Sequence, residues 1–238
     1  MGSRIPLSSF ISLRRHCEGA GFVRRYSLFT LLLKRWIVAL VIILLGLSPA
    51  SAQYVPRLMI LGDSLTAGYG LPADQAFPLK LQAALQATGV QANVINAGVS
   101  GDTTAGGLAR LDWALADKPT HVLVELGAND MLRAVDPRVT RRNLDQIVIK
   151  LKARGIRVML AGIYASPNLG KEYVDAFRNL FPGLAKKHGV PLYPFFLDGV
   201  AAVPGLNQTD GIHPNGAGVD IIVERILPAV TKFLSEKE

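Results

Sequence analysis

Residues 58–70 read LMILGDSLTAGYG, and this stretch decides the fold that the sequence predicts. Leu58–Leu61 is a short apolar run that ends at Gly62, a pattern typical of a buried β-strand. Four similar runs follow along the chain, at residues 92–96, 121–126, 158–163 and 192–196. Segments with helical periodicity lie between or after them, at residues 76–88, 104–116, 139–154, 172–187 and 217–234.

This alternation of apolar strands and helices predicts an α/β fold with a parallel sheet that helices cover on both faces. Right-handed crossovers between the strands then give a three-layer α/β/α domain, with about five strands in its sheet. No linker, repeat or second core interrupts residues 53–238 of the sequence, so we expect them to form one domain.

The first 52 residues have the features of a secretory leader. Lys34 and Arg35 precede an apolar run of twelve residues, Trp36–Leu47, and Ala50-Ser51-Ala52 is an A-x-A cleavage site. Because a membrane span needs roughly 18–20 apolar residues, cleavage before Gln53 is favoured over an uncleaved anchor. We expect residues 1–52 to be a signal peptide with an extended N-terminal region, and the protein to be periplasmic or secreted by a bacterium.

The basic charge of the chain belongs mostly to this leader. The 238 residues include 26 Lys and Arg against 18 Asp and Glu, a formal net charge of +8. Residues 1–52 hold seven basic residues and one acidic residue, a net charge of +6, which leaves +2 for residues 53–238. The charge therefore does not indicate nucleic-acid binding. Cys17 is the single cysteine of the sequence, which excludes a disulfide framework and a cysteine-based zinc site.

Polar and glycine-rich clusters follow the first three expected strands. They are Gly62-Asp63-Ser64, Asn96-Ala97-Gly98 and Gly127-Ala128-Asn129-Asp130. A fourth cluster, Asp210-Gly211-Ile212-His213-Pro214, precedes the last expected helix. Ligands of open α/β sheets bind outside the carboxyl ends of the strands, so these clusters predict the position of the functional site.

Three residues of these clusters form a candidate catalytic set. Ser64 is the candidate nucleophile, and a serine hydroxyl needs a positioned base to become reactive. His213 can be that base, and Asp210 lies close enough to hold the imidazole through Nδ1 and leave Nε2 for Ser64. Thr66 stands where a G-x-S-x-G motif requires glycine, so the nucleophile elbow of the α/β-hydrolases is absent from this segment.

The same clusters can supply an oxyanion hole. We expect the backbone N–H of Gly98, the side-chain amide of Asn129 and the backbone N–H of Ser64 to donate hydrogen bonds to a developing negative oxygen. Glycine at position 98 has no Cβ, which would allow a close approach of the substrate.

These blocks resemble the SGNH (GDSL-type) hydrolase family, and most of all its bacterial thioesterase I, lysophospholipase and arylesterase group. The resemblance rests on GDSLTAGYG at 62–70, NAGVSGDTT at 96–104, GAND at 127–130 and DGIHPN at 210–215. It implies a flavodoxin-like fold, no metal or other cofactor, and hydrolysis of esters or thioesters through an acyl-enzyme. The chain departs from that group at Met131, where the group has glycine, and in the loop Ile163–Pro167. Acyl-chain preference is therefore the property that the resemblance predicts least well.

Several other polar residues have structural interpretations. We expect Asp63 and Asp130 to bond loop N–H groups, and Glu125, which interrupts an apolar run, to support the site loops from a buried position. His121 is expected to be partly exposed, and His188 to be a cation at a helix C-terminus.

We therefore expect an exported serine esterase that acts on aryl and acyl esters or thioesters and on lysophospholipids, with small-molecule ester or lipid substrates as its partners. We expect no nucleic-acid partner and no stable membrane span after cleavage. Two other functions stay open: a carbohydrate or cell-wall O-deacetylase that uses the same residues, and a non-catalytic binding domain. The natural substrate, the acyl-chain preference and the oligomeric state do not follow from the sequence.

Overall fold

A computed structural model describes residues 29–40 and 55–236 of the chain. The chain divides into two units, Met1–Gln53 and Tyr54–Glu238. In the first unit residues 29–40 form a helix, whereas the end of the apolar run and the expected cleavage site lie outside the described residues. Within the described part of the chain, no helix is long and apolar enough to cross a membrane.

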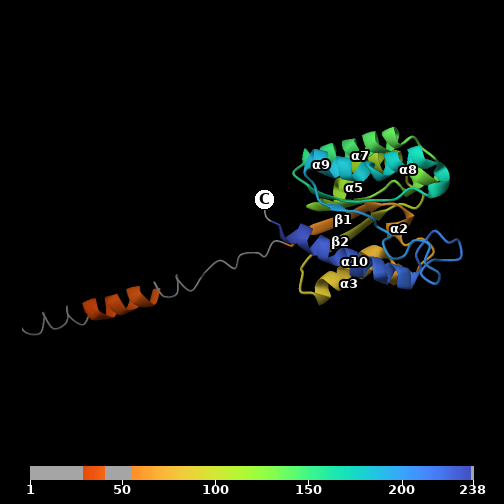
Figure 1. Ribbon diagram of the computed structural model, residues 1–238. Helices are drawn as coiled ribbons and strands as arrows, with labels where there is room; N and C mark the ends of the chain where they lie inside the picture. The colour runs from red at the N-terminus through yellow and green to blue at the C-terminus, as the bar shows by residue number, and fades with distance from the viewer. Residues whose placement is uncertain (1–28, 41–54, 237–238) are drawn as a thin grey trace, which may run out of the picture. The chain divides into compact units, whose positions relative to one another are not determined.

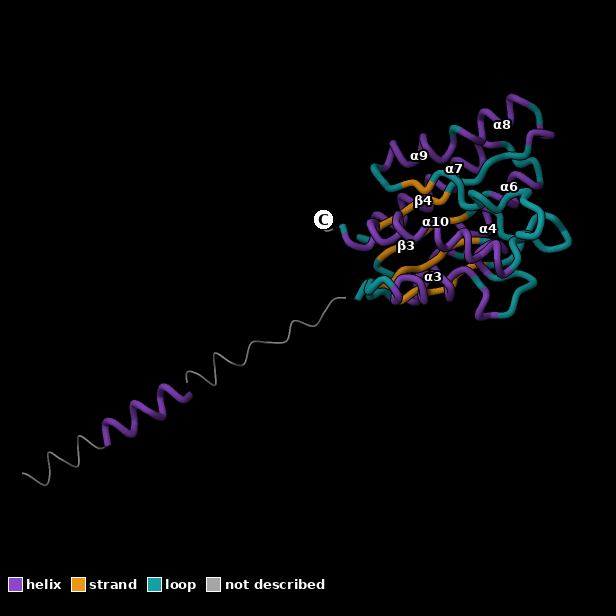
Figure 2. Tube along the Cα trace, turned by 60° about the horizontal axis from the view of Figure 1, so that its bottom comes forward, coloured by secondary structure: helices purple, strands orange, loops and turns teal. Residues whose placement is uncertain are grey.

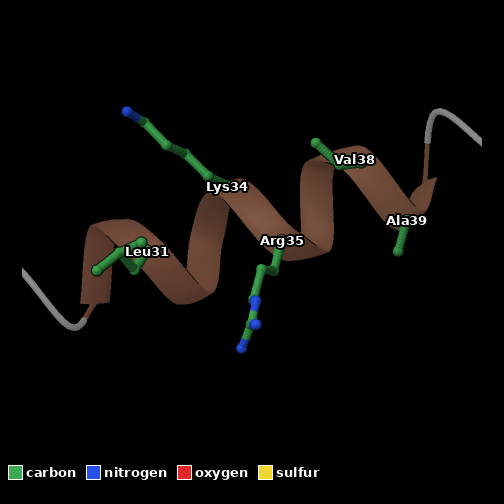
Figure 3. A pocket seen from close by; sticks show the side chains of 5 residues that line it. All are labelled: Leu31, Lys34, Arg35, Val38 and Ala39. Atoms are coloured by element: carbon green, nitrogen blue, oxygen red, sulfur yellow. The ribbon is translucent and has the colours of Figure 1, made fainter.

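The helix at residues 29–40 carries a hollow on its surface (Figure 3). The hollow is lined by Leu31, Lys34, Arg35, Val38 and Ala39. A single helix supplies all five side chains, and Lys34 and Arg35 extend from it in different directions. The hollow therefore has no converging polar groups that could bind a ligand, and we assign no site to it.

The second unit contains a sheet of five parallel strands. These are β1 (Arg57–Gly62), β2 (Asn93–Gly98), β3 (His121–Glu125), β4 (Arg157–Ala161) and β5 (Leu192–Tyr193). Their order is β2-β1-β3-β4-β5, so the winding reverses between β1 and β3. Gly62 pairs with Gly98 on one side and with Glu125 on the other. The loops that follow β1, β2 and β3 consequently start side by side at one edge of the sheet, at the switch point where such folds bind ligands.

Helices cover both faces of this sheet, which confirms the predicted three-layer α/β/α fold (Figures 1 and 2). One face carries α3 (Phe77–Ala87) and α10 (Gly216–Ser235), which pack against each other. The other face carries α7 (Pro137–Lys152) together with its neighbours α4 (Thr104–Ala109) and α9 (Leu180–His188). The side chains of Leu58–Leu61 and Val122–Val124 are fully buried between the two layers, as continuous apolar strands of a covered sheet require.

The expected helix at 104–116 is divided into three pieces. They are α4, α5 (Leu111–Ala114) and the 3₁₀ turn η2 (Leu115–Asp117). Arg110 lies at the first break, where its guanidinium donates to Asp102 Oδ2 at 2.5 Å and to Gly62 O at 3.1 Å. Gly107 also packs so closely on Leu126 that a Cβ would lie 2.4 Å from a Leu126 methyl group. These contacts of Arg110 and Gly107 fix the backbone here, so the predicted helix is not continuous.

Two further predicted elements are shorter than expected, one helix and one strand. The expected helix at 172–187 forms α8 (Lys171–Arg178) and α9, with a break at Asn179. Pro182 lies in the first turn of α9, where it lacks an N–H and its ring excludes the carbonyl of residue 178 from a continuous helix. The strand expected at 192–196 is only the two residues of β5. The Gly162 N–H donates to Tyr193 O, but Gly162 O accepts from the N–H of Phe196 instead of residue 195, so an extra residue ends the regular pairing with β4.

Two one-turn helices that the sequence did not predict start at the carboxyl ends of the central strands. They are α2 (Ser64–Ala67) after β1 and α6 (Ala128–Leu132) after β3. Two 3₁₀ turns, η1 (Ala73–Gln75) and η3 (Pro167–Leu169), complete the second unit. Because α2 begins with Ser64 and α6 contains Asn129, these short helices hold two of the expected site residues.

Candidate active site

Ser64 lies in the first turn of α2, directly beyond the end of β1. Asp63 caps this turn: its Oδ1 accepts the backbone N–H of Leu65 at 3.0 Å. Gly68 ends the helix with a left-handed backbone, φ +88°. Ser64 is half-buried, while Asp63 and Leu65 on either side of it are buried. The hydroxyl is thus fixed by a buried cap but remains reachable from the edge of the sheet.

His213 and Asp210 lie on the loop between β5 and α10, 149 and 146 residues further along the chain. His213 Nε2 lies 2.9 Å from Ser64 Oγ, and His213 Nδ1 lies 2.6 Å from Asp210 Oδ2. Asp210 Oδ1 accepts the backbone N–H groups of Ile212 and His213 at 2.9 and 3.0 Å. These two N–H groups and the imidazole lower the pKa of Asp210 to about 2, so its carboxylate stays ionised.

The fold therefore brings Ser64, His213 and Asp210 together in one line of hydrogen bonds. Such a line can transfer the serine proton to the imidazole while the carboxylate holds the imidazole in one orientation. The arrangement needs the reversal of winding at β1, because the serine comes from the first strand of the unit and the histidine from the loop before its last helix.

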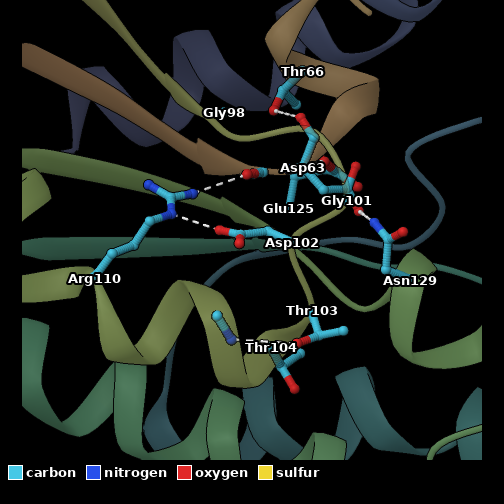
Figure 4. A network of polar contacts seen from close by, with 12 residues as sticks. Asp63, Thr66, Gly98, Gly101, Asp102, Thr103, Thr104, Arg110, Glu125 and Asn129 are labelled. Carbon is cyan, nitrogen blue, oxygen red and sulfur yellow. Dashed lines mark hydrogen bonds and ion pairs between the residues drawn. The ribbon is translucent and has the colours of Figure 1, made fainter. Parts of the chain in front are cut away.

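Asn129, on α6, is hydrogen-bonded to Asp63, the residue that precedes Ser64. Its Nδ2 donates to Asp63 Oδ2 at 3.2 Å, across the gap between the ends of β3 and β1 (Figure 4). An amide nitrogen has two hydrogens, so one remains for another acceptor. Asp63 thereby fixes both the turn that carries Ser64 and the orientation of the Asn129 amide.

Gly98 does not fit the role expected of it. Its backbone N–H donates to the side-chain Oδ1 of Asn96 at 2.9 Å, and so is not available to a substrate. A Cβ at this position would lie 2.6 Å from the backbone nitrogen of Ala67 and 2.8 Å from Thr66 Oγ1. Glycine is needed here because the end of β2 packs directly on α2.

Gly101, three residues further on, has the features that Gly98 lacks. Within the described part of the chain, no hydrogen-bond acceptor is found for its backbone N–H, as is also the case for Ser64. Its φ is +85°, and its carbonyl accepts a hydrogen bond from Arg133 Nη2 at 2.9 Å, which ties the loop to the end of α6. The S-G-D run at 100–102, with a glycine inside a polar loop after a strand, is the signal in the sequence that could have indicated it.

Two buried carboxyl groups lie behind this site (Figure 4). Asp63 and Glu125 are both fully buried, and the backbone N–H of Asp63 points at Glu125 Oε2 from 3.5 Å. Burial raises the pKa of Asp63 to about 6, against the lowering effect of its hydrogen bonds from Leu65 and Asn129. Burial, and after it the charge of Asp63, raises the pKa of Glu125 well above its usual value. Among the residues that the structure describes, none bonds to Glu125 Oε1, so this side chain supports the site loops less than its position suggested.

Asp130 joins the loop after β2 to the helix after β3. It accepts hydrogen bonds from the backbone N–H of Thr104 at 2.7 Å, from the Thr104 hydroxyl at 2.5 Å and from the Thr140 hydroxyl at 3.1 Å. All three residues are buried. The structural interpretation of Asp130 fits these contacts, which hold α4, α6 and α7 together beneath the site.

The two other histidines that the structure describes, His121 and His188, lie outside this line of hydrogen bonds. His121 was expected to be partly exposed, but it is only 3% exposed, because Phe233 of α10 packs edge-on against its ring. Burial, with a smaller effect from the charge of Arg157, lowers the pKa of His121 to about 4. His188 forms a hydrogen bond to Asp145 Oδ1 at 2.6 Å. In the described ranges, no three His, Cys, Asp or Glu side chains are grouped as metal ligands.

Comparison with known proteins places the chain in a family. The sequence profile of the GDSL-like Lipase/Acylhydrolase family matches residues 60–221, which span all of the site described above. The chain belongs to this family, and it is a carboxylic ester hydrolase.

Three relatives are similar over nearly the whole second unit. Esterase TesA of Pseudomonas aeruginosa is 41% identical over 186 residues, which cover 78% of this chain and 91% of that protein. Thioesterase 1/protease 1/lysophospholipase L1 of Escherichia coli K12 is 43% identical over 183 residues, 76% of this chain and 85% of that one. The crystal structure of a psychrotrophic esterase EstA from Pseudoalteromonas, inhibited by monoethylphosphonate, superposes with a TM-score of 0.72 at 35% identity and covers 76% of this chain and 99% of that one.

Proposed function

We propose that this protein is an exported serine esterase in which Ser64 is the nucleophile, His213 the general base and acid, and Asp210 the residue that orients His213. The observation that carries the proposal is the line of short hydrogen bonds from Ser64 Oγ through the imidazole to a carboxylate that stays ionised. Ester hydrolysis requires a base next to the hydroxyl, and this geometry supplies it.

The reaction follows from the positions of these atoms. His213 Nε2 takes the proton of Ser64 Oγ as the oxygen attacks the carbonyl carbon of the ester. The same nitrogen then gives that proton to the leaving alcohol oxygen, and an acyl group remains on Ser64. A water molecule, deprotonated by His213 Nε2, attacks the carbonyl carbon of the acyl-enzyme. The bond from that carbon to Ser64 Oγ then breaks, the acid leaves, and His213 returns the proton to the Ser64 oxygen.

The negative oxygen formed in each half of the reaction needs donors that do not depend on bulk water. We propose the backbone N–H of Ser64, the second Nδ2 hydrogen of Asn129 and the backbone N–H of Gly101 for this role, with Gly101 in place of Gly98. The two backbone groups have no other acceptor among the described residues, and Asp63 holds the Asn129 amide from the opposite side.

The substrates that fit best are aryl esters and esters or thioesters of short to medium acyl chains, with lysophospholipids as a further class. Leu132, on the helix that carries Asn129, is 54% exposed, and Ile212, beside His213, is 46% exposed. Exposed apolar side chains on the segments that carry Asn129 and His213 favour an acyl chain over a sugar. The relatives from P. aeruginosa and E. coli, which are named an esterase and a thioesterase and lysophospholipase, support the same classes.

We further propose that residues 1–52 are removed as a signal peptide and that residues 53–238 act in the periplasm or outside the cell. The charged pair Lys34-Arg35, the apolar run and the A-x-A site support this. Thioester hydrolysis would then be a capability of the site, because acyl-CoA is confined to the cytoplasm. N-terminal sequencing of exported protein is the test, and a first residue other than Gln53 would contradict the proposed cleavage site.

The function itself is tested with p-nitrophenyl esters from acetate to palmitate, with the Ser64→Ala variant as the control. We expect hydrolysis with an optimum at medium or long chains and a loss of about 10⁴-fold or more in kcat on substitution. Activity confined to acetate would favour the O-deacetylase, for which the exposed rings of Tyr69 and Tyr164 could contact a sugar. Undiminished hydrolysis by folded Ser64→Ala protein would overturn the role of Ser64.

A further inference from the structure

The loop that carries Asp210 and His213 is built around Gln208. The backbone N–H of Gln208 donates to His213 O at 2.7 Å, and Gln208 O accepts the N–H of Gly211 at 2.9 Å. Asn207 and Pro214 form an antiparallel bridge just outside these two contacts. Residues 208–213 therefore form one closed turn, and whatever holds Gln208 also holds the imidazole.

The side chain of Gln208 reaches from this turn to the segment of the nucleophile. Its Nε2 donates to Tyr69 O at 2.8 Å and to Pro214 O at 3.0 Å, so both amide hydrogens are used. Tyr69 lies five residues after Ser64, and its ring contacts the His213 imidazole with 4.7 Å between the ring centroids. Gln208 thus fixes the backbone of the residue whose ring packs on the base.

Gly70 shows how closely this contact is fitted. A Cβ on Gly70 would lie 2.3 Å from Gln208 Oε1, and the backbone at position 70 has φ +71°. Any side chain at position 70 would therefore displace the Gln208 amide from the Tyr69 carbonyl.

Two hydrogen bonds join the described residues of the nucleophile segment, 62–71, to those of the base loop, 207–215. One is the Ser64–His213 bond, and the other is the Gln208–Tyr69 bond. The first is lost whenever Ser64 carries an acyl group, because the serine oxygen then has no hydrogen to donate. Of the two hydrogen bonds between these described segments, only the Gln208–Tyr69 bond then remains, together with the contact of the Tyr69 ring on the imidazole.

We infer that Gln208 is a positioning residue that keeps His213 in place during hydrolysis of the acyl-enzyme, through its bond to the Tyr69 carbonyl and the ring contact which that bond supports. The inference rests on the proposed function. It predicts an unequal effect on the two halves of the reaction: removing the bond slows deacylation far more than acylation, in which Ser64 itself still donates to His213.

The experiment compares rate constants for acylation and deacylation of the purified full chain with p-nitrophenyl butyrate, by stopped-flow detection of the p-nitrophenolate burst. In Gln208→Met, which keeps the length of the side chain but has no donor, we expect deacylation to slow by about 10- to 100-fold and acylation by less than about threefold. Gln82→Met is the matched control, because Gln82 also bridges two elements, through Ala92 O at 2.8 Å and the Val94 N–H at 2.8 Å, but lies on α3 away from the site.

Gly70→Ala tests the Gln208–Tyr69 bond from the nucleophile segment. It replaces Gln208→Met as the test if that variant does not fold. Its own control is Gly89→Ala, where φ is +79° and a Cβ would meet nothing within 4 Å, so that variant has the backbone strain without the displacement. We expect Gly70→Ala to slow deacylation as Gln208→Met does, and the double variant to be no slower than either single one.

Unchanged rate constants in both variants would overturn the inference, and so would equal losses in acylation and deacylation, which indicate a general loss of structure. Neither result would touch the proposed function, which the Ser64→Ala variant tests separately.

Discussion

Ser64 and Asn129 stand on one-turn helices fixed by buried carboxyl groups, whereas His213 and Asp210 stand on a loop that is largely open to water. Asp63 and Glu125 have no exposed surface, while the Asp210 side chain is 37% exposed and that of His213 19%. The carboxylate that orients the base thus ionises easily, and the carboxyl groups behind the nucleophile do not. Substitutions on the base loop should therefore affect activity alone, and those behind the nucleophile should affect activity and stability together.

Among the substitutions that compare the supports of the two regions, Asp210→Asn should have the largest effect. An asparagine keeps the shape of the turn but stabilises neither the required tautomer nor the protonated imidazole, so we expect kcat to fall by about 10³- to 10⁴-fold. Because the side chain is partly exposed, the urea midpoint should stay close to that of the wild type. Steady-state kinetics and urea unfolding of the same preparation measure both. A large loss of stability would contradict the contrast between the two regions.

A smaller loss of activity, joined by a loss of stability, is expected for Asp63→Asn. The Leu65 N–H and Asn129 Nδ2 donate to different oxygens of Asp63, and an asparagine has an NH₂ group in place of one of these oxygens, so one of the two donors loses its acceptor. We expect kcat to fall by about 10- to 100-fold as the Asn129 amide loses its orientation, and the free energy of unfolding to fall by about 1–2 kcal/mol.

The effect of Asp63→Asn on kcat should depend on whether Asn129 is present. In the background of Asn129→Ala, Asp63→Asn should have little further effect on kcat, because the amide it positions is gone. Equal losses in both backgrounds would show that Asp63 acts only through the turn that carries Ser64. Thr104→Val, which removes a buried hydroxyl that donates to Asp130, is a control for a hydrogen bond lost elsewhere in the same layer.

The sequence predicted the fold and the proximity of Ser64, Asp210 and His213 because both follow from local patterns. Apolar runs ending at glycine identify strands, and the spacing of Asp210 and His213 within one turn sets their contact. The approach of that turn to Ser64 followed from the topology, since strand ends share one edge of the sheet. The four sequence segments that resemble the family then indicated that the loops containing them form one site.

What the sequence missed depends on contacts between distant segments. The Gly98 N–H is taken by the side chain of Asn96, and glycine at 98 serves packing on α2. His121 is buried because α10, more than a hundred residues later, places Phe233 against it. The break at Arg110 reflects its bonds to Asp102 and Gly62 O rather than a helix-breaking residue at that position.

The smallest effect, and the finest test of the contrast, concerns the pH dependence of stability. Glu125 binds its proton more tightly in the folded than in the unfolded protein, because burial and the charge of Asp63 disfavour its ionised form. The free energy of unfolding should therefore fall as pH rises above the unfolded value near 4.3, and continue to fall until the folded group ionises. Glu125→Gln removes this cost and should be more stable than the wild type at neutral and alkaline pH.

The sign of the difference in stability between Glu125→Gln and the wild type distinguishes two cases. In one the buried Glu125 carboxyl is kept neutral, and in the other its ionised form is stabilised by partners. Glutamine has nearly the same size, and its carbonyl can still face the Asp63 N–H, so the advantage of Glu125→Gln should vanish near pH 4.5 and grow as pH rises. Urea midpoints at several pH values measure it, with exposed Glu224→Gln to report the removal of a carboxylate from the surface. A variant less stable than the wild type at neutral pH would mean that an ionised Glu125 is bound by partners, and that the buried carboxyl groups stabilise the nucleophile side through their charge.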